Sequence, residues 1–113
     1  MTNTRTKTAL ELMLTTMESV RGCVVVVGRF DRDRHRQLKR AINSVILNLA
    51  EANGRRGGDR RRSIETARGS LEETRVALKL AMAWGYLPEK KVERIDAVLD
   101  RVGAMTWRWL HSA

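Results

Sequence analysis

IETARGSLEETRVALKLAMAWGYL, the stretch from Ile64 to Leu87, decides the fold of this chain. Its core-type residues recur in a seven-residue repeat, at Ile64, Ala67, Leu71, Thr74, Leu78 and Ala81. This period is typical of helices that pack together in bundles. A second stripe flanks the later half, at Val76, Leu80, Ala83 and Leu87. The two stripes predict that this half of the helix is buried on two sides.

Apolar spacings of three and four also occur before and after this stretch, which indicates further helices. The run of four valines from Val24 to Val27 would suit a strand, but the helical pattern before it continues through it. We predict helices over about 8–27, 33–53, 59–85 and 88–110, in one domain spanning 1–113. Because the connections are short, the predicted fold is an all-α, antiparallel, up-down-up-down four-helix bundle.

The predicted helix ends carry residues that favour such positions. Asp31 or Asp33 should cap the second helix and Asp59 the third, because an aspartate side chain accepts hydrogen bonds from free backbone N–H groups. Gly54 should end the second helix in a left-handed conformation. Gly85 should end the third.

Composition indicates an aliphatic core and excludes several classes of protein. The chain has 113 residues, of which 42% are hydrophobic and only 4% aromatic, which is too apolar for a disordered chain. The single cysteine, Cys23, can form neither an internal disulfide nor a zinc site, and we interpret it as a core residue. The polar start and the short apolar runs lead us to expect a cytoplasmic protein that does not enter membranes.

The residue types that catalysis or metal binding requires are not grouped in the sequence. His35 and His111 have no partner at metal-ligand spacing, and Glu72 and Glu73 are adjacent and so point different ways on a helix. We therefore expect no catalytic residue, no metal, no cofactor and no small-molecule substrate.

Positive charge is concentrated in the middle of the chain. The formal net charge is +9, and the span Arg29–Arg62 alone holds eleven basic and four acidic residues, a net of +7. Arg60, Arg61 and Arg62 fall in the first turn of the third predicted helix, where the helix dipole disfavours cations. We interpret this cluster as self-repelling, so that it needs either solvent or a bound anion.

A nucleic acid is the anion that this charge suits best, because arginine pairs with phosphate through planar donors. The candidate nucleic-acid-binding residues are Arg36, Lys39, Arg40, Arg55, Arg56, Arg60, Arg61 and Arg62. A merely solvated basic face is an equal alternative. No base-reading motif is present, so binding should follow backbone and shape. Two other readings stay open, a protein-interaction scaffold and a self-assembling bundle without a ligand.

The tryptophans suggest a second kind of contact. Trp107 and Trp109 are two residues apart and cannot share one helix face, so one of them leaves the core stripe. Together with Trp84 they are candidate subunit-interface residues, since tryptophan is enriched at interfaces. Covering an end of the bundle is an equally good interpretation.

Three segments resemble a known family. They are NLAEANGRR at 48–56, ARGSLEE at 67–73 and WGYL at 84–87. In order and spacing they are similar to conserved segments of the bacterial family of four-helix-bundle proteins encoded in intervening sequences of 23S ribosomal RNA. The resemblance covers roughly Phe30 to Trp109.

This resemblance implies a left-handed bundle that assembles into a cyclic homopentamer. Related proteins include the accessory variability protein of diversity-generating retroelements, which binds a reverse transcriptase and nucleic acid. The resemblance therefore also implies that the ligand is RNA in preference to DNA, and that a reverse-transcriptase- or ribosome-associated protein is a partner. The chain departs from the family at two places. Ala52 stands where the family usually has glycine, and the segment 44–48 lacks the family's usual proline, so we expect the second helix to be straighter.

Four residues in these segments are candidates for structural roles. Gly69 lies in a helix interior, where glycine costs about 1 kcal/mol relative to alanine, and we expect it to admit a neighbouring helix. Asn48 and Glu51 lie one turn apart and are expected to bond to each other or to the loop that follows Gly54.

Overall fold

Four helices account for almost all of the described chain. The computed structural model describes residues 4–111, and the terminal residues 1–3 and 112–113 of the predicted domain lie outside the described residues. The helices are α1 (Thr4–Phe30), α2 (Arg32–Asn53), α3 (Gly57–Ala83) and α4 (Glu89–His111). No strand occurs between residues 4 and 111, so the predicted all-α class is confirmed.

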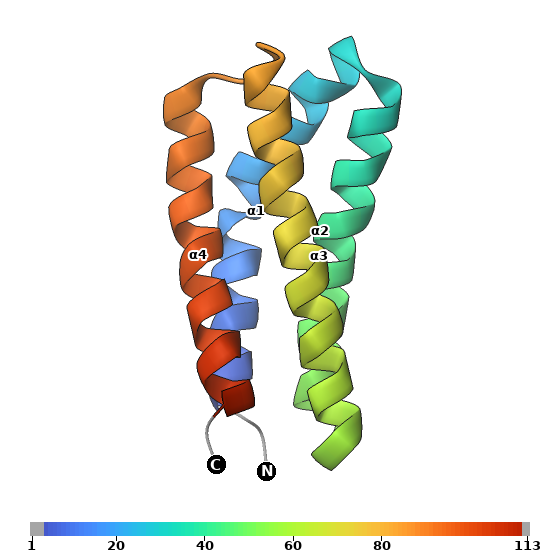
Figure 1. Ribbon diagram of the computed structural model, residues 1–113, viewed down its shortest axis with the longest axis vertical. Helices are drawn as coiled ribbons and strands as arrows, with labels where there is room; N and C mark the ends of the chain where they lie inside the picture. The colour runs from blue at the N-terminus through green and yellow to red at the C-terminus, as the bar shows by residue number, and fades with distance from the viewer. Residues whose placement is uncertain (1–3, 112–113) are drawn as a thin grey trace.

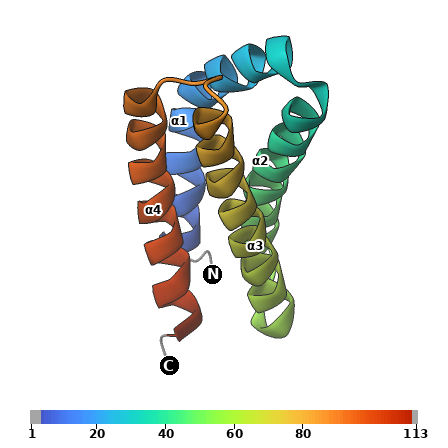
Figure 2. The same cartoon turned by 45° about the horizontal axis from the view of Figure 1, so that its top comes forward.

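The helices lie side by side along the long axis of a molecule that measures 43 × 23 × 20 Å. Figure 1 shows consecutive helices running in opposite directions, and each helix contacts its two neighbours in the cyclic order α1, α2, α3, α4. The pair α2 and α3 makes the closest association and lies opposite α1 and α4 (Figure 2). The left-handed winding that the resemblance implies stays a prediction.

The core is aliphatic, as the composition predicted. Met13, Leu38, Leu78 and Leu99 are among its largest fully buried side chains, one from each helix, so all four helices contribute to it. The seven-residue stripe of α3 is buried along its whole length. Cys23 is also fully buried, and this burial raises the pKa of its thiol, which suits a neutral core residue.

The second stripe of α3 is not buried, so the prediction of burial on two sides was wrong. Val76 is 59% exposed, Ala83 is exposed and Leu80 is half-buried, whereas Leu87 is buried. The reason is geometric, because α3 packs against α2 and α4 and its opposite face has no further helix to cover it. An exposed apolar surface therefore runs along the outside of α3.

The first helix extends further than predicted. The valine run from Val24 to Val27 is helical, and α1 continues through Gly28 to Phe30. Gly28 is needed there because a Cβ atom at this position would lie 2.7 Å from Nδ1 of His35 in α2. That nitrogen donates a hydrogen bond to the carbonyl of Val24 at 2.9 Å, which ties the two helices together.

Two of the predicted helix ends are wrong. Gly54 has φ −95°, so α2 does not end in a left-handed residue. Asp59 lies inside the first turn of α3, which already begins at Gly57 with φ +55°, and the cap position belongs to Arg56 without a side-chain cap bond. In the tight turn between α2 and α3, the residue with positive φ is Gly57, the glycine that starts α3.

The predicted aspartate cap of α2 is confirmed at Asp31. Its Oδ1 atom accepts a hydrogen bond from the backbone N–H of Arg34 at 3.0 Å. We expect Asp31→Ala to lower the free energy of unfolding by about 1 kcal/mol, the usual cost of losing such a cap. Urea unfolding followed by circular dichroism measures this, with Asp33→Ala as the matched control in the same helix turn. Equal losses in the two variants would contradict the assignment.

Gly69 does not admit a neighbouring helix within the chain, so this prediction was wrong. It is exposed, and a Cβ atom built on it would meet nothing within 4 Å. It lies two turns before Val76 on the uncovered outer side of α3.

Candidate nucleic-acid interface

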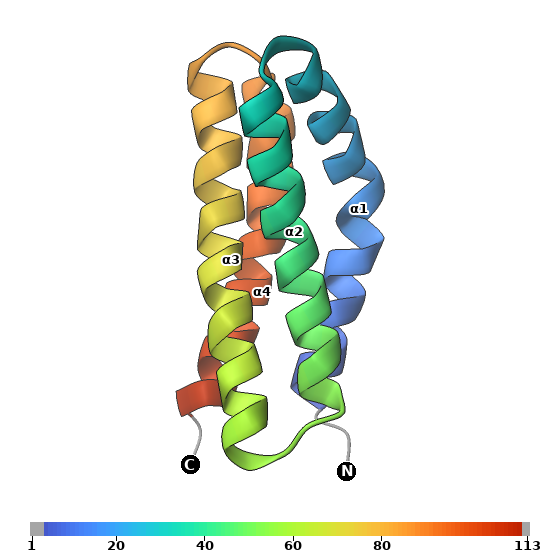
Figure 3. The ribbon, with the colours of Figure 1, turned by 90° about the vertical axis from the view of Figure 1, so that its right-hand side faces the viewer.

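Two arginines of the predicted cluster cap the ends of neighbouring helices. Nε of Arg60 donates to the carbonyl of Ala52 at 2.9 Å, at the end of α2. Nη1 of Arg61 donates to the carbonyl of Leu110 at 3.0 Å, at the end of α4. The first turn of α3 lies beside these two helix ends (Figure 3). Cations at the C-terminal end of a helix satisfy free carbonyls and the negative end of the dipole.

Two other arginines near the turn between α2 and α3 lie close to carboxylates. Arg55 pairs with Glu51 at 2.7 Å, and Arg62 lies 3.7 Å from Asp59. Arg61, besides capping α4, lies 3.4 Å from Glu65. Acids and helix-end carbonyls thus compensate part of the charge of this cluster, while the side chains of Arg55, Arg61 and Arg62 stay about half or more exposed to solvent. The interpretation that the cluster needs solvent or an anion stays a prediction.

A small polar hollow of about 180 Å³ lies between the last turns of α2 and the first turns of α3. It is lined by Asn48, Glu51, Arg55, Asp59, Arg62, Ser63 and Thr66. The two arginines and the two carboxylates make its charge balanced. A phosphate entering this hollow would have to displace Glu51 or Asp59 from the arginines, which weakens the case for an anion site here.

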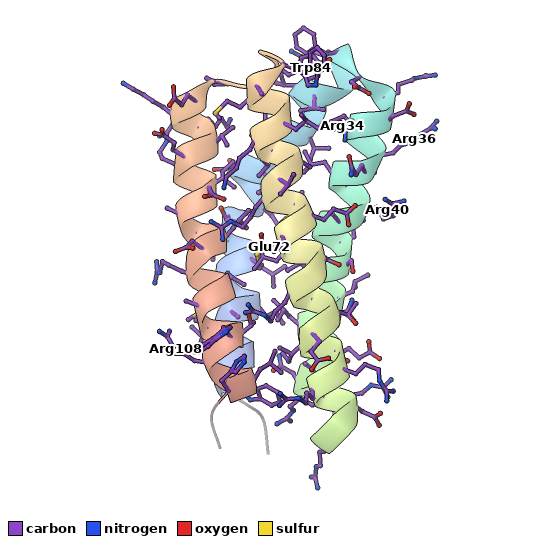
Figure 4. All side chains as sticks on the ribbon, in the orientation of Figure 1. Arg34, Arg36, Arg40, Glu72, Trp84 and Arg108 are labelled. Atoms are coloured by element: carbon purple, nitrogen blue, oxygen red, sulfur yellow. The ribbon has the colours of Figure 1, made fainter. Side chains whose placement is uncertain are left out.

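The basic residues of α2 are in a different situation. Arg36, Lys39 and Arg40 line a shallow hollow of about 640 Å³ on the outer face of α2, together with His35, Asn43, Ser44 and Leu47. Arg36 and Lys39 are exposed, and neither forms an ion pair with any carboxylate among the described residues. Arg40, which is 75% exposed, makes one long contact of 3.5 Å with Glu73. Figure 4 shows Arg36 and Arg40 pointing away from the bundle.

These three residues, Arg36, Lys39 and Arg40, form what we call the basic face of α2. From Arg40 to Asn53, the last residue of α2, the helix rises about 20 Å, so the basic face is well separated from the turn between α2 and α3. The structure thus divides the eight predicted binding residues into two groups. The positive charge of the basic face is largely unpaired. At the turn, by contrast, most arginines bond to carboxylates or to helix-end carbonyls, and Arg56 is exposed beside them.

The polar contacts of Asn48 differ from those predicted, whereas Glu51 bonds to the loop that follows Gly54, which is one of the two predicted alternatives. Nδ2 of Asn48 donates to the carbonyl and the hydroxyl of Ser44, at 2.8 and 3.2 Å. The Ser44 hydroxyl in turn hydrogen-bonds with that of Ser70 at 2.6 Å, which joins α2 to α3. Glu51 pairs with Arg55, as noted above, rather than with Asn48. Both residues therefore support the region of the α2–α3 turn, Asn48 through Ser44 and Glu51 through Arg55 of the loop.

The three tryptophans lie in different surroundings. Trp84 is 67% exposed at the end of α3 (Figure 4), and Trp107 is 50% exposed in the last turns of α4. Trp107 stacks on His111 with ring centroids 4.1 Å apart. Trp109 is half-buried and packs against the core. The expectation that one of the pair leaves the core stripe is confirmed, and it is Trp107.

Sequence reasoning missed the arginines that join α3 to α4. Nε and Nη2 of Arg75 donate to the two carboxylate oxygens of Asp96, at 2.7 and 3.0 Å. These bonds hold the pKa of Asp96 below its usual value. Arg68 donates to the carbonyl of Gly103 and the hydroxyl of Thr106, at 2.6 and 3.0 Å. The signal in the sequence is that both arginines flank the buried stripe of α3, where long side chains reach the neighbouring helix.

The described residues contain no group of three or more histidine, cysteine, aspartate or glutamate side chains that could hold a metal ion. The two histidines bond to backbone carbonyls, His35 to Val24 and His111 to Trp107. Within residues 4–111, no helix combines the length and the apolar character that crossing a membrane requires.

Comparison with known proteins gives one match. A family model described as 23S rRNA-intervening sequence protein matches residues 29–108. This range includes α2, α3 and nearly all of α4, and with them both groups of basic residues. No curated protein matches the chain.

Proposed function

The chain belongs to the 23S rRNA-intervening sequence protein family, and from this premise we propose that it is a non-enzymatic, oligomeric bundle that binds nucleic acid in the cytoplasm. The observation that carries the proposal is the basic face of α2, where Arg36 and Lys39 pair with no carboxylate of the described chain. Phosphates would supply the missing negative charge.

Binding of this kind is driven by the release of counterions from the nucleic acid. Arginine donors arranged on a rigid helix can contact successive phosphates without reading bases. The description of the family refers to ribosomal RNA, and for that reason we propose that the ligand is structured RNA in preference to DNA.

A direct titration tests the proposal. A fluorescently labelled RNA hairpin is titrated with the full chain at about 0.1 M salt, and a DNA duplex of equal length serves as competitor. We expect a saturable rise in anisotropy that the DNA displaces less well than unlabelled RNA. No rise at any concentration at which the chain stays in solution would overturn the proposal.

The uncovered outer side of α2 and α3 supports the oligomeric part of the proposal. On the outer side of α2, Leu47 is 66% exposed, and on that of α3, Val76 is 59% exposed. We call these two residues and the half-buried Leu80 the apolar band. Gly69 lies beside the band and leaves room for a helix of another copy. Interfaces often combine such an apolar centre with a polar rim, and here the basic face of α2 would form that rim.

We expect the wild-type chain to have a solution mass several times 12.9 kDa, and five times that value for the proposed pentamer. Changing Leu47 and Val76 together to glutamine should lower the mass, because it replaces the apolar centre of the contact. Light scattering coupled to gel filtration measures this. Leu14→Gln, at a 53% exposed position on α1, is the matched control and should leave the mass unchanged. A wild-type monomer would overturn the oligomeric proposal.

The apolar band also favours a second candidate function, that of an adaptor for another protein, such as one associated with a reverse transcriptase or the ribosome, without a direct role in nucleic-acid binding. Pull-downs after nuclease treatment separate the two. Recovery of one defined protein partner, together with no RNA binding in the titration, would favour the adaptor.

A further inference from the structure

Three aromatic side chains lie at the end of the bundle where α1 and α3 finish. Phe30 is 61% and Trp84 67% exposed, the latter being the largest exposed fraction among the large apolar side chains of the described residues. Phe30 stacks on Tyr86, with ring centroids 4.9 Å apart and ring planes within 7° of parallel. We call Phe30, Trp84 and Tyr86 the aromatic end. It keeps two aromatic rings open to solvent on rigid supports.

Exposed arginines lie at the same end of the bundle as these rings. Arg29 precedes Phe30, and Arg32 and Arg36 lie in the first turns of α2, directly after α1. None of the three pairs with a carboxylate among the described residues. Two acids lie among them, Asp31, which caps α2, and the exposed Asp33, so the positive charges outnumber the negative ones. The aromatic end therefore lies within an excess of positive charge.

We propose that the aromatic end binds unpaired nucleobases of RNA, by stacking on Trp84 and Phe30, while the adjacent arginines hold the phosphates. This inference rests on the proposed function and specifies which part of the RNA is bound. Aromatic rings next to basic side chains are the combination that single strands require, because every base offers a π-face and every nucleotide a phosphate. A fully paired duplex would offer its bases only at its ends.

Continuity of charge also favours RNA over a second copy of the chain at this end. Arg36 belongs both to the surroundings of the aromatic end and to the basic face of α2. A strand leaving the aromatic rings can thus follow α2 along mainly basic residues, with Asp33 as the exposed acid in the first turn. A second copy docked through the same end would bring these arginines against each other.

Two RNAs and four proteins test this inference. The RNAs are an unstructured single strand and a blunt duplex of equal length. The proteins are wild type, Trp84→Ala, Trp84→Phe and, as the control, Trp107→Ala, which removes an exposed indole from the last turns of α4. Binding is measured by anisotropy, folding by circular dichroism and mass by light scattering.

We expect Trp84→Ala to weaken binding of the single strand about 5- to 100-fold, since one stacked base contributes on that scale. Binding of the duplex should change less than twofold, Trp84→Phe should recover most of the loss, and Trp107→Ala should behave as wild type. If Trp84→Ala binds the single strand as wild type does, the inference is overturned while the proposed function stands. If it lowers the mass of the RNA-free protein, Trp84 serves a subunit contact and the inference is likewise overturned. If wild type binds neither RNA, both fail.

Discussion

Changing Arg36, Lys39 and Arg40 together to glutamine is expected to weaken RNA binding roughly 100-fold or more at about 0.1 M salt. Affinity scales with salt concentration to a power of about −0.7 to −0.9 per phosphate contact, so each contact contributes a factor of roughly 5 to 8 at this salt. The three side chains are well exposed and Arg36 and Lys39 are unpaired, so their charge is available to phosphates. Anisotropy titration of the labelled hairpin measures the loss.

The arginines that cap helices provide the control. Arg60 and Arg61 donate to the ends of α2 and α4, so changing both to glutamine should lower stability by about 1 kcal/mol for each lost bond and should weaken RNA binding only a few-fold. The matched variant has only Arg36 and Lys39 changed to glutamine, so that it also loses two positive charges. Equal binding losses in these two variants would mean that net charge, and not the basic face, determines affinity.

Asp96→Ala is expected to lower the free energy of unfolding by about 2–3 kcal/mol. Asp96 accepts two hydrogen bonds from Arg75, whose side chain is only 18% exposed, and such charged bonds contribute about 1.5–3 kcal/mol. Without Asp96, the guanidinium group would stay largely buried with its best partner gone. Urea unfolding measures the loss.

Asp100→Ala is the matched control for this variant. Asp100 lies 3.3 Å from the same guanidinium group but is 70% exposed, so its removal should cost less than about 1 kcal/mol. Equal costs for the two variants would contradict the assignment of Asp96 as the residue that joins α3 to α4.

The contribution of Asp96 should also depend on pH. Arg75 holds the pKa of Asp96 below its usual value, so the folded state binds the proton less readily than the unfolded chain does. The stabilisation is therefore complete above the unfolded pKa of about 3.9 and is lost as pH falls through the lower folded pKa. The difference in stability between wild type and Asp96→Asn should shrink on acidification from pH 7 to about pH 3.

Much of the fold could be predicted because periodicity determines which face of each helix is buried. The stripe from Ile64 to Ala81 is the clearest case, and every member of it is buried. The second stripe failed because the same apolar spacing arises whether a face meets the core or is left uncovered. A single sequence does not show whether Val76 faces the core or the uncovered side of α3.

The candidate site was harder to predict, since a positive residue looks the same in a sequence whether it is paired or free. Within their own helix Arg60 and Arg61 are poorly placed, because the helix dipole disfavours cations in the first turn. In the folded chain the ends of α2 and α4 lie beside them and accept their hydrogen bonds. The contrast between these capping arginines and the unpaired Arg36 depends on which helices are neighbours, and only the structure gives that.

The salt dependence of RNA binding tests the central claim most directly. The dissociation constant of the labelled hairpin is measured for wild type and for the variant lacking Arg36, Lys39 and Arg40, from about 0.05 to 0.3 M salt. We expect a steep linear loss of log affinity with log salt for wild type, and a slope shallower by about 2 to 3 for the variant, one contact for each residue removed. Identical slopes for the two proteins, or no RNA binding by wild type at the lowest salt, would contradict the claim that the basic face of α2 binds RNA.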